Sequence, residues 1–261
     1  DLLQHLRSRA IRIHEAETTS ASPFARSLVF AYVAAYIYEQ DAPIAERRAQ
    51  ALALDRGLLA ELLGEAELRE LIDPQVLDAL EAELQHLEPE RRARDADELH
   101  DLLRRLGDLT EAELAERSVA DPAPWLAQLA NQRRAARLTI AGEPRWISAE
   151  EAGLYRDALG CVPPPGLPDA FIAVSEAPLE QLLRRYARTH GPFPTREAAH
   201  RFGLRPAQIE PVLRLLETPG ELVRGEIRPL GTEPEWCDAE VLRRLRRRTL
   251  ARARDAVAPV D

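Results

Sequence analysis

The sequence predicts a mainly α-helical protein with small β-hairpins, in which a helical segment is followed by two winged-helix domains in tandem. Two repeated stretches carry this prediction. The letters LLRR occur at residues 102–105 and again at 182–185. Downstream, Trp146-Ile147-Ser148-Ala149-Glu150 returns as Trp236-Cys237-Asp238-Ala239-Glu240. Between the two markers each copy has short helical patterns and then a polar hairpin, which is the order of elements in a winged helix.

Composition limits the fold further. At 261 residues, 45% of them apolar, the chain is long enough for two or three folded domains. Only 5% is aromatic, which favours several modest cores over one large core. All 35 basic residues are arginine and Met is absent. A GC-rich genome explains the arginine bias, and we expect the sequence to begin inside a longer protein.

The net charge of −9 is unevenly distributed along the chain. Residues 1–90 contain 17 acidic residues and 8 arginines, whereas residues 177–261 contain 12 acidic residues and 16 arginines. This gradient favours a local contact with an anionic partner near the C-terminal end, not a surface that coats nucleic acid generally.

Several classes of protein are excluded by missing signals. Cys161 and Cys237 are too few for a disulfide framework or a metal set, and the six histidines show no ligand spacing. The longest apolar run, residues 28–38, is too short to cross a bilayer, and no signal peptide is legible. We therefore expect a cytoplasmic protein without a membrane partner.

Residues 1–90 are predicted to form a helical segment of their own. Ala10–Glu17 alternates like a strand, and Ser22-Pro23 begins a buried helix that extends to about residue 40. Asp73-Pro74 begins the last of several short helices, expected near 43–54, 56–63, 66–72 and 74–87. The charged run 88–94 lacks apolar anchors and is expected to be a domain boundary.

The two repeats define unit 1, residues 95–160, and unit 2, residues 177–238. In unit 1 we expect helices at 96–106, 110–117 and 121–132, a wing of Arg137–Ile140 and Pro144–Ile147 around Ala141-Gly142, and a closing helix at 149–159. A Pro-rich linker, residues 161–176, follows. In unit 2 we expect helices at 177–189, 195–202 and 206–217, a wing over 222–236 with its tip near Gly231, and then an Arg-rich helix at 239–257, within a last segment 239–261 that leads to the next domain.

The third helix and the wing of a winged helix are the parts that usually meet nucleic acid. Arginine suits phosphate and glutamine can read a base edge, so such residues on these elements are the candidates. They are Arg205, Gln208, Arg214, Arg224 and Arg228 in unit 2, Arg244, Arg247 and Arg248 on the last helix, and Gln128, Gln132, Arg133, Arg134, Arg137 and Arg145 in unit 1. Because some winged helices only pack against protein, nucleic-acid contact is favoured slightly for unit 2 and disfavoured for unit 1, whose wing adjoins Glu143, Glu150 and Glu151. For the last helix, phosphate binding and pairing with acids of the preceding region are equally open.

Other conspicuous residues have simpler structural explanations. Trp125, Trp146 and Trp236 are expected to pack inside the units, with base stacking as the second choice. Asp97-Glu98-Leu99-His100 spells a helicase DExH box, but it opens an amphipathic helix instead of ending a buried strand, so the match is fortuitous. Without a lysine there is no nucleotide-binding loop, and the sequence predicts no catalytic residues.

The N-terminal third resembles a known family. Asp41-Ala42-Pro43 with Glu46-Arg47-Arg48-Ala49, and Leu63-Gly64 with Leu68-Arg69-Glu70-Leu71, lie within a run over residues 30–84 that resembles the end of the helicase-associated domain of large helicase-related (Lhr) proteins. LHDLLRRLGDLTEAEL and WCDAEVLRRLRRR resemble the winged-helix modules that follow it in the long bacterial members, which implies a bacterial protein. The resemblance covers essentially the whole chain.

This resemblance implies a segment of a superfamily 2 hydrolase that uses ATP and Mg²⁺, bound by motor domains elsewhere in the polypeptide, to unwind DNA and RNA–DNA hybrids in the 3′-to-5′ direction, with a role in DNA repair. Its partners would be single-stranded DNA, RNA–DNA hybrid and those motor domains, and no cofactor would bind to this chain. A protein-interaction or homo-oligomerisation scaffold is the first alternative. The second is support for a glycosylase-type C-terminal region, whose Gln-x-Gln signature is absent from this sequence.

Overall fold

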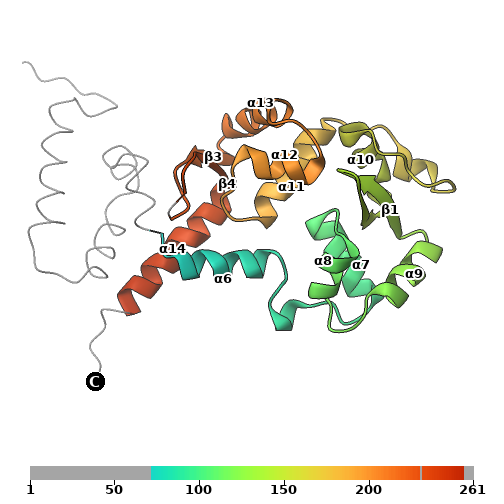
Figure 1. Ribbon diagram of the computed structural model, residues 1–261, viewed down its shortest axis with the longest axis horizontal. Coiled ribbons are helices and arrows are strands. Elements are labelled where there is room, and N and C mark those ends of the chain that lie inside the picture. Colours follow the sequence, from blue (N-terminus) through green and yellow to red (C-terminus); the bar gives the residue numbers. More distant parts are fainter. Residues whose placement is uncertain (1–71, 230, 256–261) are drawn as a thin grey trace, which may run out of the picture.

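The computed structural model describes residues 72–229 and 231–255 (Figure 1). The strand expected at 10–17 and the helices expected between 23 and 72 lie outside the described residues. Within them the chain is mainly helical with two small antiparallel ribbons, which confirms the predicted fold class. In Figure 1, unit 1 lies to the right, unit 2 lies at the upper centre, and two further helices lie side by side at the lower left.

Unit 1 has the predicted three helices and ribbon. The elements are α7 (Ala96–Leu106), α8 (Glu111–Glu116), α9 (Ala123–Asn131), β1 (Ala135–Ile140) and β2 (Glu143–Ser148). Local sequence signals set the helix starts: the Asp95 carboxylate accepts the Glu98 N–H at 2.9 Å, and Thr110 and Glu113 form a capping box. Strands β1 and β2 pair antiparallel from Ala135 opposite Ser148 to Ile140 opposite Glu143.

Unit 2 repeats this order. Its elements are α11 (Pro178–Thr189), α12 (Thr195–Phe202), α13 (Pro206–Glu217), β3 (Leu222–Gly225) and β4 (Glu235–Asp238), and they lead into α14 (Ala239–Asp255). The turn between α12 and α13 contains Gly203 with φ +66°, a left-handed conformation that favours glycine. All three helices of unit 2 begin and end within one residue of their predicted bounds.

The repeated tryptophans occupy equivalent positions. Trp146 exchanges two backbone hydrogen bonds with Leu109, at 2.7 and 2.9 Å, and Trp236 exchanges two with Phe193, at 2.8 and 2.9 Å. Each pair is a single β-bridge that joins the wing to the segment between the first and second helices of its unit. The tryptophans thus join wing to helices, and Trp236 is only 1% exposed, so the packing explanation of this residue is correct.

The segment between the units is packed against the protein. Unit 1 ends with η2 (Ala149–Glu151) and α10 (Ala152–Leu159), and the linker that follows contains η3 (Asp169–Ile172). Arg156 Nη1 donates to the Ile172 carbonyl at 2.7 Å, and a Cβ on Gly153 would lie 2.5 Å from the Ala173 carbonyl oxygen. The Pro-rich segment therefore lies against α10 instead of acting as a free spacer.

The hydrophobic cores extend across the expected domain limits. One core contains Leu138, Ile140 and Ile147 of the unit 1 ribbon together with Leu183 and Leu213 of unit 2. The unit 1 helices have their own core around Leu99, Leu103 and Leu129. The ribbon of unit 1 thus lies between its own helices and unit 2, and the division of the chain into domains stays a prediction.

Helix α6 (Pro74–Leu84) packs against elements that are far from it in the sequence. Asp73 caps it as predicted, accepting the Gln75 N–H at 2.8 Å. Its apolar face meets the last helix and the second wing in a core that includes Leu80, Ile227 and Leu245 (Figure 1). The chain then returns to unit 1 through the 3₁₀ turn η1 (Pro89–Arg91).

The charged run 88–94 has an apolar anchor that its composition concealed. Ala93 is 2% exposed, its N–H donates to the Arg117 carbonyl at 2.8 Å, and its carbonyl accepts the Val119 N–H at 2.9 Å. The expectation that this run lacks apolar anchors is therefore wrong. An alanine is too small to stand out in a periodicity, yet it is the residue that fits where two backbones approach closely.

Candidate nucleic-acid interface

The third helix of unit 2, α13, presents the predicted polar residues to solvent. Arg205, Gln208 and Arg214 are all exposed. Gln208 Oε1 accepts the Arg205 backbone N–H at 3.1 Å and its Nε at 3.3 Å, which holds both side chains at the N-terminal end of the helix. Arg214 Nη2 lies 2.8 Å from Glu210, but both are well exposed, so this pair is weak and Arg214 can exchange partners.

The second wing carries two arginines with different surroundings. Arg224 on β3 is exposed and its guanidinium lies 5.3 Å from the centroid of the Trp236 ring. Arg228 donates to both carboxylate oxygens of Glu197, each at 3.1 Å. Its pKa is raised, because Glu197 and Glu81 outweigh the effect of its burial, which lowers it. Arg224 is thus open to a ligand, whereas Arg228 joins the wing to α12.

Helix α14 directs part of its basic face at α6. Arg244 Nη2 lies 2.9 Å from Glu83, and Arg248 bonds the other oxygen of the same carboxylate at 2.5 Å. Burial raises the pKa of Glu83, but the hydrogen bond and charge of Arg248 and the charge of Arg244 outweigh it, so the pKa is lowered. Pairing with acids of the preceding region, one of the two open explanations, therefore describes these arginines. Arg247 is exposed and forms no ion pair with the residues that the structure describes.

The candidates in unit 1 differ in exposure. Gln128, Gln132 and Arg133, at the end of α9, are exposed. Arg134 bonds Asp97 at 2.5 Å and His100 at 3.2 Å. Asp97 and His100, two residues of the apparent helicase box, thus lie on α7 and contact Arg134, the residue before β1. This structural role agrees with the prediction that the match to a helicase box is fortuitous.

The wing of unit 1 is not a free surface. Arg145 is 3% exposed and donates from Nη1 to Asp108 at 2.7 Å and to the Arg201 carbonyl at 2.8 Å. At the wing tip, Ala141 packs so closely on unit 2 that a Cβ added to Gly203 would lie 2.8 Å from its Cα. Arg145, predicted to contact nucleic acid from the wing, is therefore buried within the protein. The tip of the wing lies against the turn that precedes α13.

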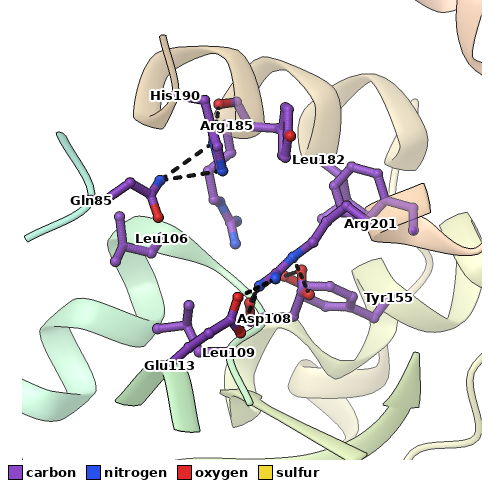
Figure 2. A pocket seen from close by; sticks show the side chains of 12 residues that line it. Gln85, Leu106, Asp108, Leu109, Glu113, Tyr155, Leu182, Arg185, His190 and Arg201 are labelled. Atoms are coloured by element: carbon purple, nitrogen blue, oxygen red, sulfur yellow. Dashed lines mark hydrogen bonds and ion pairs between the residues drawn. The ribbon is translucent and has the colours of Figure 1, made fainter. Parts of the chain in front are cut away.

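A polar cluster holds the two units together (Figure 2). Arg201 reaches from α12 into unit 1, where its Nε lies 3.0 Å from Asp108 and its Nη1 lies 2.5 Å from Glu113. Asp108, whose side chain is 4% exposed, also accepts the Tyr155 hydroxyl at 3.3 Å. Burial and the Asp108 charge raise the pKa of Tyr155, so it donates as a neutral phenol. No sequence pattern predicts this cluster, because its members are far apart in the chain.

The cluster surrounds a cavity too small for a substrate. The cavity has a volume of about 30 Å³, and its lining includes Gln85, Asp108, Arg185 and His190. That volume holds one or two waters. Across residues 72–229 and 231–255, no three His, Cys, Asp or Glu residues converge in a way that could bind a metal ion. In the same part of the chain every helix is too short or too polar to span a bilayer.

The fold and the exposed face of unit 2 define a tandem winged-helix protein. Comparison with known proteins shows what the chain is similar to. Residues 70–174 match the model of the winged-helix domain of large helicase-related proteins. The chain is 50% identical over 262 residues to the Lhr helicase/probable uracil glycosylase of Mycolicibacterium smegmatis and 40% identical over 262 residues to the Lhr helicase/uracil glycosylase of Escherichia coli, covering 100% and 99% of this chain. The chain is thus similar over its whole length to large helicase-related proteins, and it spans 17% of the length of each of these relatives.

Proposed function

We propose that this chain is a nucleic-acid-binding, non-catalytic accessory segment of an ATP-dependent helicase, and that it contacts single-stranded DNA and RNA–DNA hybrids through unit 2. The observation that carries the proposal is the contrast between the two wings. Arg224 of unit 2 is exposed and bonds no carboxylate in the part of the chain that the structure describes, whereas Arg145 of unit 1 is buried in ion pairs. The relatives, both named helicases, support the class of partner.

ATP and Mg²⁺ belong to the motor domains of the same polypeptide in this proposal. The residues of this chain do not fit a nucleotide site, because a phosphate-binding loop needs a lysine and the sequence has none. We therefore assign no step of ATP hydrolysis to this chain. Its contribution is to hold a strand by phosphate contacts, which position a protein on nucleic acid without reading its sequence.

Salt-dependent binding tests this function. The chain is titrated with a labelled single strand and with a labelled RNA–DNA hybrid between about 50 and 200 mM salt, and affinity is expected to fall steeply as salt rises. Arg205→Ala and Arg214→Ala are each expected to weaken binding about threefold to tenfold. Arg94→Ala is the matched control, because Arg94 is exposed and paired with Glu98 four residues away, as Arg214 is with Glu210. Binding that is absent, or equally sensitive to the control, would contradict the proposal.

A supporting role for a glycosylase is the second candidate, because both relatives carry that activity in their names. The chain lacks the Gln-x-Gln signature, so it would support a catalytic site located elsewhere. Incubation of the chain with uracil-containing DNA is expected to give no abasic product. Release of uracil would show that the chain itself is catalytic.

A further inference from the structure

Both ribbons place an arginine directly opposite the repeated tryptophan. Arg137 of β1 is the cross-strand partner of Trp146, and Arg224 of β3 is the partner of Trp236. Both arginines are exposed. The repeat therefore builds the same Arg–Trp pair twice, at the same position of the wing.

The residue that accepts the indole N–H differs between the units. Trp146 Nε1 donates to Glu111 at 3.3 Å, and Trp236 Nε1 donates to the Thr195 hydroxyl at 2.9 Å. Glu111 is the first residue of α8 and Thr195 is the first residue of α12, so the two acceptors are structural equivalents. At this one position unit 1 has a carboxylate and unit 2 has a neutral hydroxyl.

The charge of the residue that accepts the indole N–H determines whether the wing arginine has a carboxylate beside it. In unit 1, Arg137 Nη2 lies 3.7 Å from the same Glu111 oxygen that accepts the indole. In unit 2, Arg224 lies over the Trp236 ring and forms no ion pair with a residue that the structure describes. Arg137 therefore has a carboxylate beside it, whereas no described carboxylate forms an ion pair with Arg224.

We propose that Arg224, held over Trp236, is the site at which the second wing binds a phosphodiester group of a nucleic-acid strand, and that Thr195, a hydroxyl where unit 1 has a carboxylate, keeps this site open. The proposal rests on the proposed function and names the residues that decide which unit performs it. In unit 1 the Glu111 carboxylate would repel a phosphate that approached Arg137.

The geometry favours phosphate over a base. Trp236 is 1% exposed, so its ring has no free face on which a base could stack. The guanidinium above it is a planar fork that matches phosphate oxygens. Stacking on an aromatic face fixes the orientation of that fork in advance, so less rotational freedom is lost when the ligand binds.

The test exchanges the residues that distinguish the units. Thr195→Glu places beside Arg224 the carboxylate that unit 1 has, and it is expected to fold, because Glu111 already accepts an indole N–H at the equivalent position. Arg224→Ala removes the site, and Arg224→Lys retains the charge but loses the fork. Val174→Glu is the matched control, since it adds the same charge at a residue that is 87% exposed on the segment between the units.

Affinity of the full chain for a labelled single strand is measured at several salt concentrations, with thermal unfolding of each variant as a check on folding. We expect Thr195→Glu and Arg224→Ala to weaken binding about fivefold or more and to reduce the salt slope by about 0.7, which corresponds to one phosphate contact on a single strand. Arg224→Lys is expected to lose about threefold. In the wild-type chain the Nε–Hε resonance of Arg224, assigned from its loss in Arg224→Lys, is expected to shift when the strand is added.

The outcomes separate this inference from the function on which it rests. Wild-type binding with Thr195→Glu and Arg224→Ala no weaker than Val174→Glu would overturn the inference while the proposed function stands. Absence of wild-type binding would overturn both. A loss of binding confined to Arg224→Ala, with Thr195→Glu unaffected, would contradict the role of Thr195.

Discussion

Unit 1 and unit 2 have the same order of helices and strands, but they use their wings in opposite ways. The unit 1 wing inserts Leu138 and Ile140 into a core shared with unit 2 and buries Arg145 against Asp108. The unit 2 wing keeps Arg224 at the surface. The comparison teaches that a repeated fold does not imply a repeated function. On our proposal, unit 2 binds nucleic acid and unit 1 supports unit 2.

The largest effect is expected where the units meet. Asp108→Ala leaves Arg145, which is 3% exposed, and Arg201 without their shared carboxylate. Arg145 keeps Glu143 and Arg201 keeps Glu113, but each loses a buried hydrogen bond between charged groups. At about 1.5–3 kcal/mol for each bond, the free energy of unfolding should fall by roughly 3–5 kcal/mol in chemical denaturation. Asp97→Ala is the control, because that carboxylate is 78% exposed and its loss should change stability by at most about 0.5 kcal/mol. Similar small changes for both variants would mean that the cluster does not hold the units together.

The two tryptophans allow a matched comparison within the repeat. Trp236 is 1% exposed and Trp146 is half-buried. Trp236→Ala should lower the free energy of unfolding by roughly 3–5 kcal/mol, and Trp146→Ala by about half as much, because less apolar area is lost. Equal losses in denaturant titrations would show that the two wings are held equally by their tryptophans.

Acid should destabilise the folded chain through His190, which contacts Gln85 and Tyr186. Burial lowers its pKa to about 4, and the charges of Arg201 and Arg117 act in the same direction. Because the unfolded chain binds this proton more readily, the stability contributed by neutral His190 is present above its unfolded pKa of about 6.5 and is lost as the pH falls towards 4. The loss should reach roughly 1.4 kcal/mol per pH unit.

This effect is checked by denaturing the wild type and His190→Gln between pH 7 and pH 4. The range spans the unfolded and the folded pKa of the wild-type histidine. Glutamine retains a hydrogen-bonding side chain near Gln85 but does not titrate in this range. The steep pH dependence should therefore be much reduced in the variant. A variant that loses stability with acid as the wild type does would assign the effect to other groups.

The smallest expected effect is a gain of binding in unit 1. Glu111→Thr removes the carboxylate that lies 3.7 Å from Arg137 and leaves a hydroxyl to accept the Trp146 indole, as Thr195 does for Trp236. Affinity for a single strand should rise about twofold, because an exposed ion pair of this kind is weak. Unchanged affinity in the same salt titration would show that Glu111 does not restrain Arg137.

Local signals in the sequence were sufficient for most of the helices. Asp95, Thr110 and Asp73 each cap the helix that their position indicates, and Gly203 adopts the left-handed turn before α13. These contacts join residues two or three positions apart, or depend on the backbone of a single residue. A pattern read along the chain therefore contains the information that places them.

The candidate site was predicted less completely, because exposure depends on residues distant in sequence. Arg145 and Arg224 look alike on a wing, yet Arg145 meets Asp108 and the Arg201 carbonyl, 37 and 56 residues away. Arg244 likewise meets Glu83, 161 residues away. One signal was available: Leu138, Ile140 and Ile147 make the unit 1 hairpin too apolar for a wing that faces water.

The most direct test of the central claim is hydrogen exchange of the chain with and without a bound single strand. If unit 2 alone provides the binding face, amides at the start of α13 and in β3–β4 should become protected, whereas α9 and the β1–β2 turn should exchange as before. Protection centred on α9 and the unit 1 wing, with unit 2 unchanged, would contradict the account.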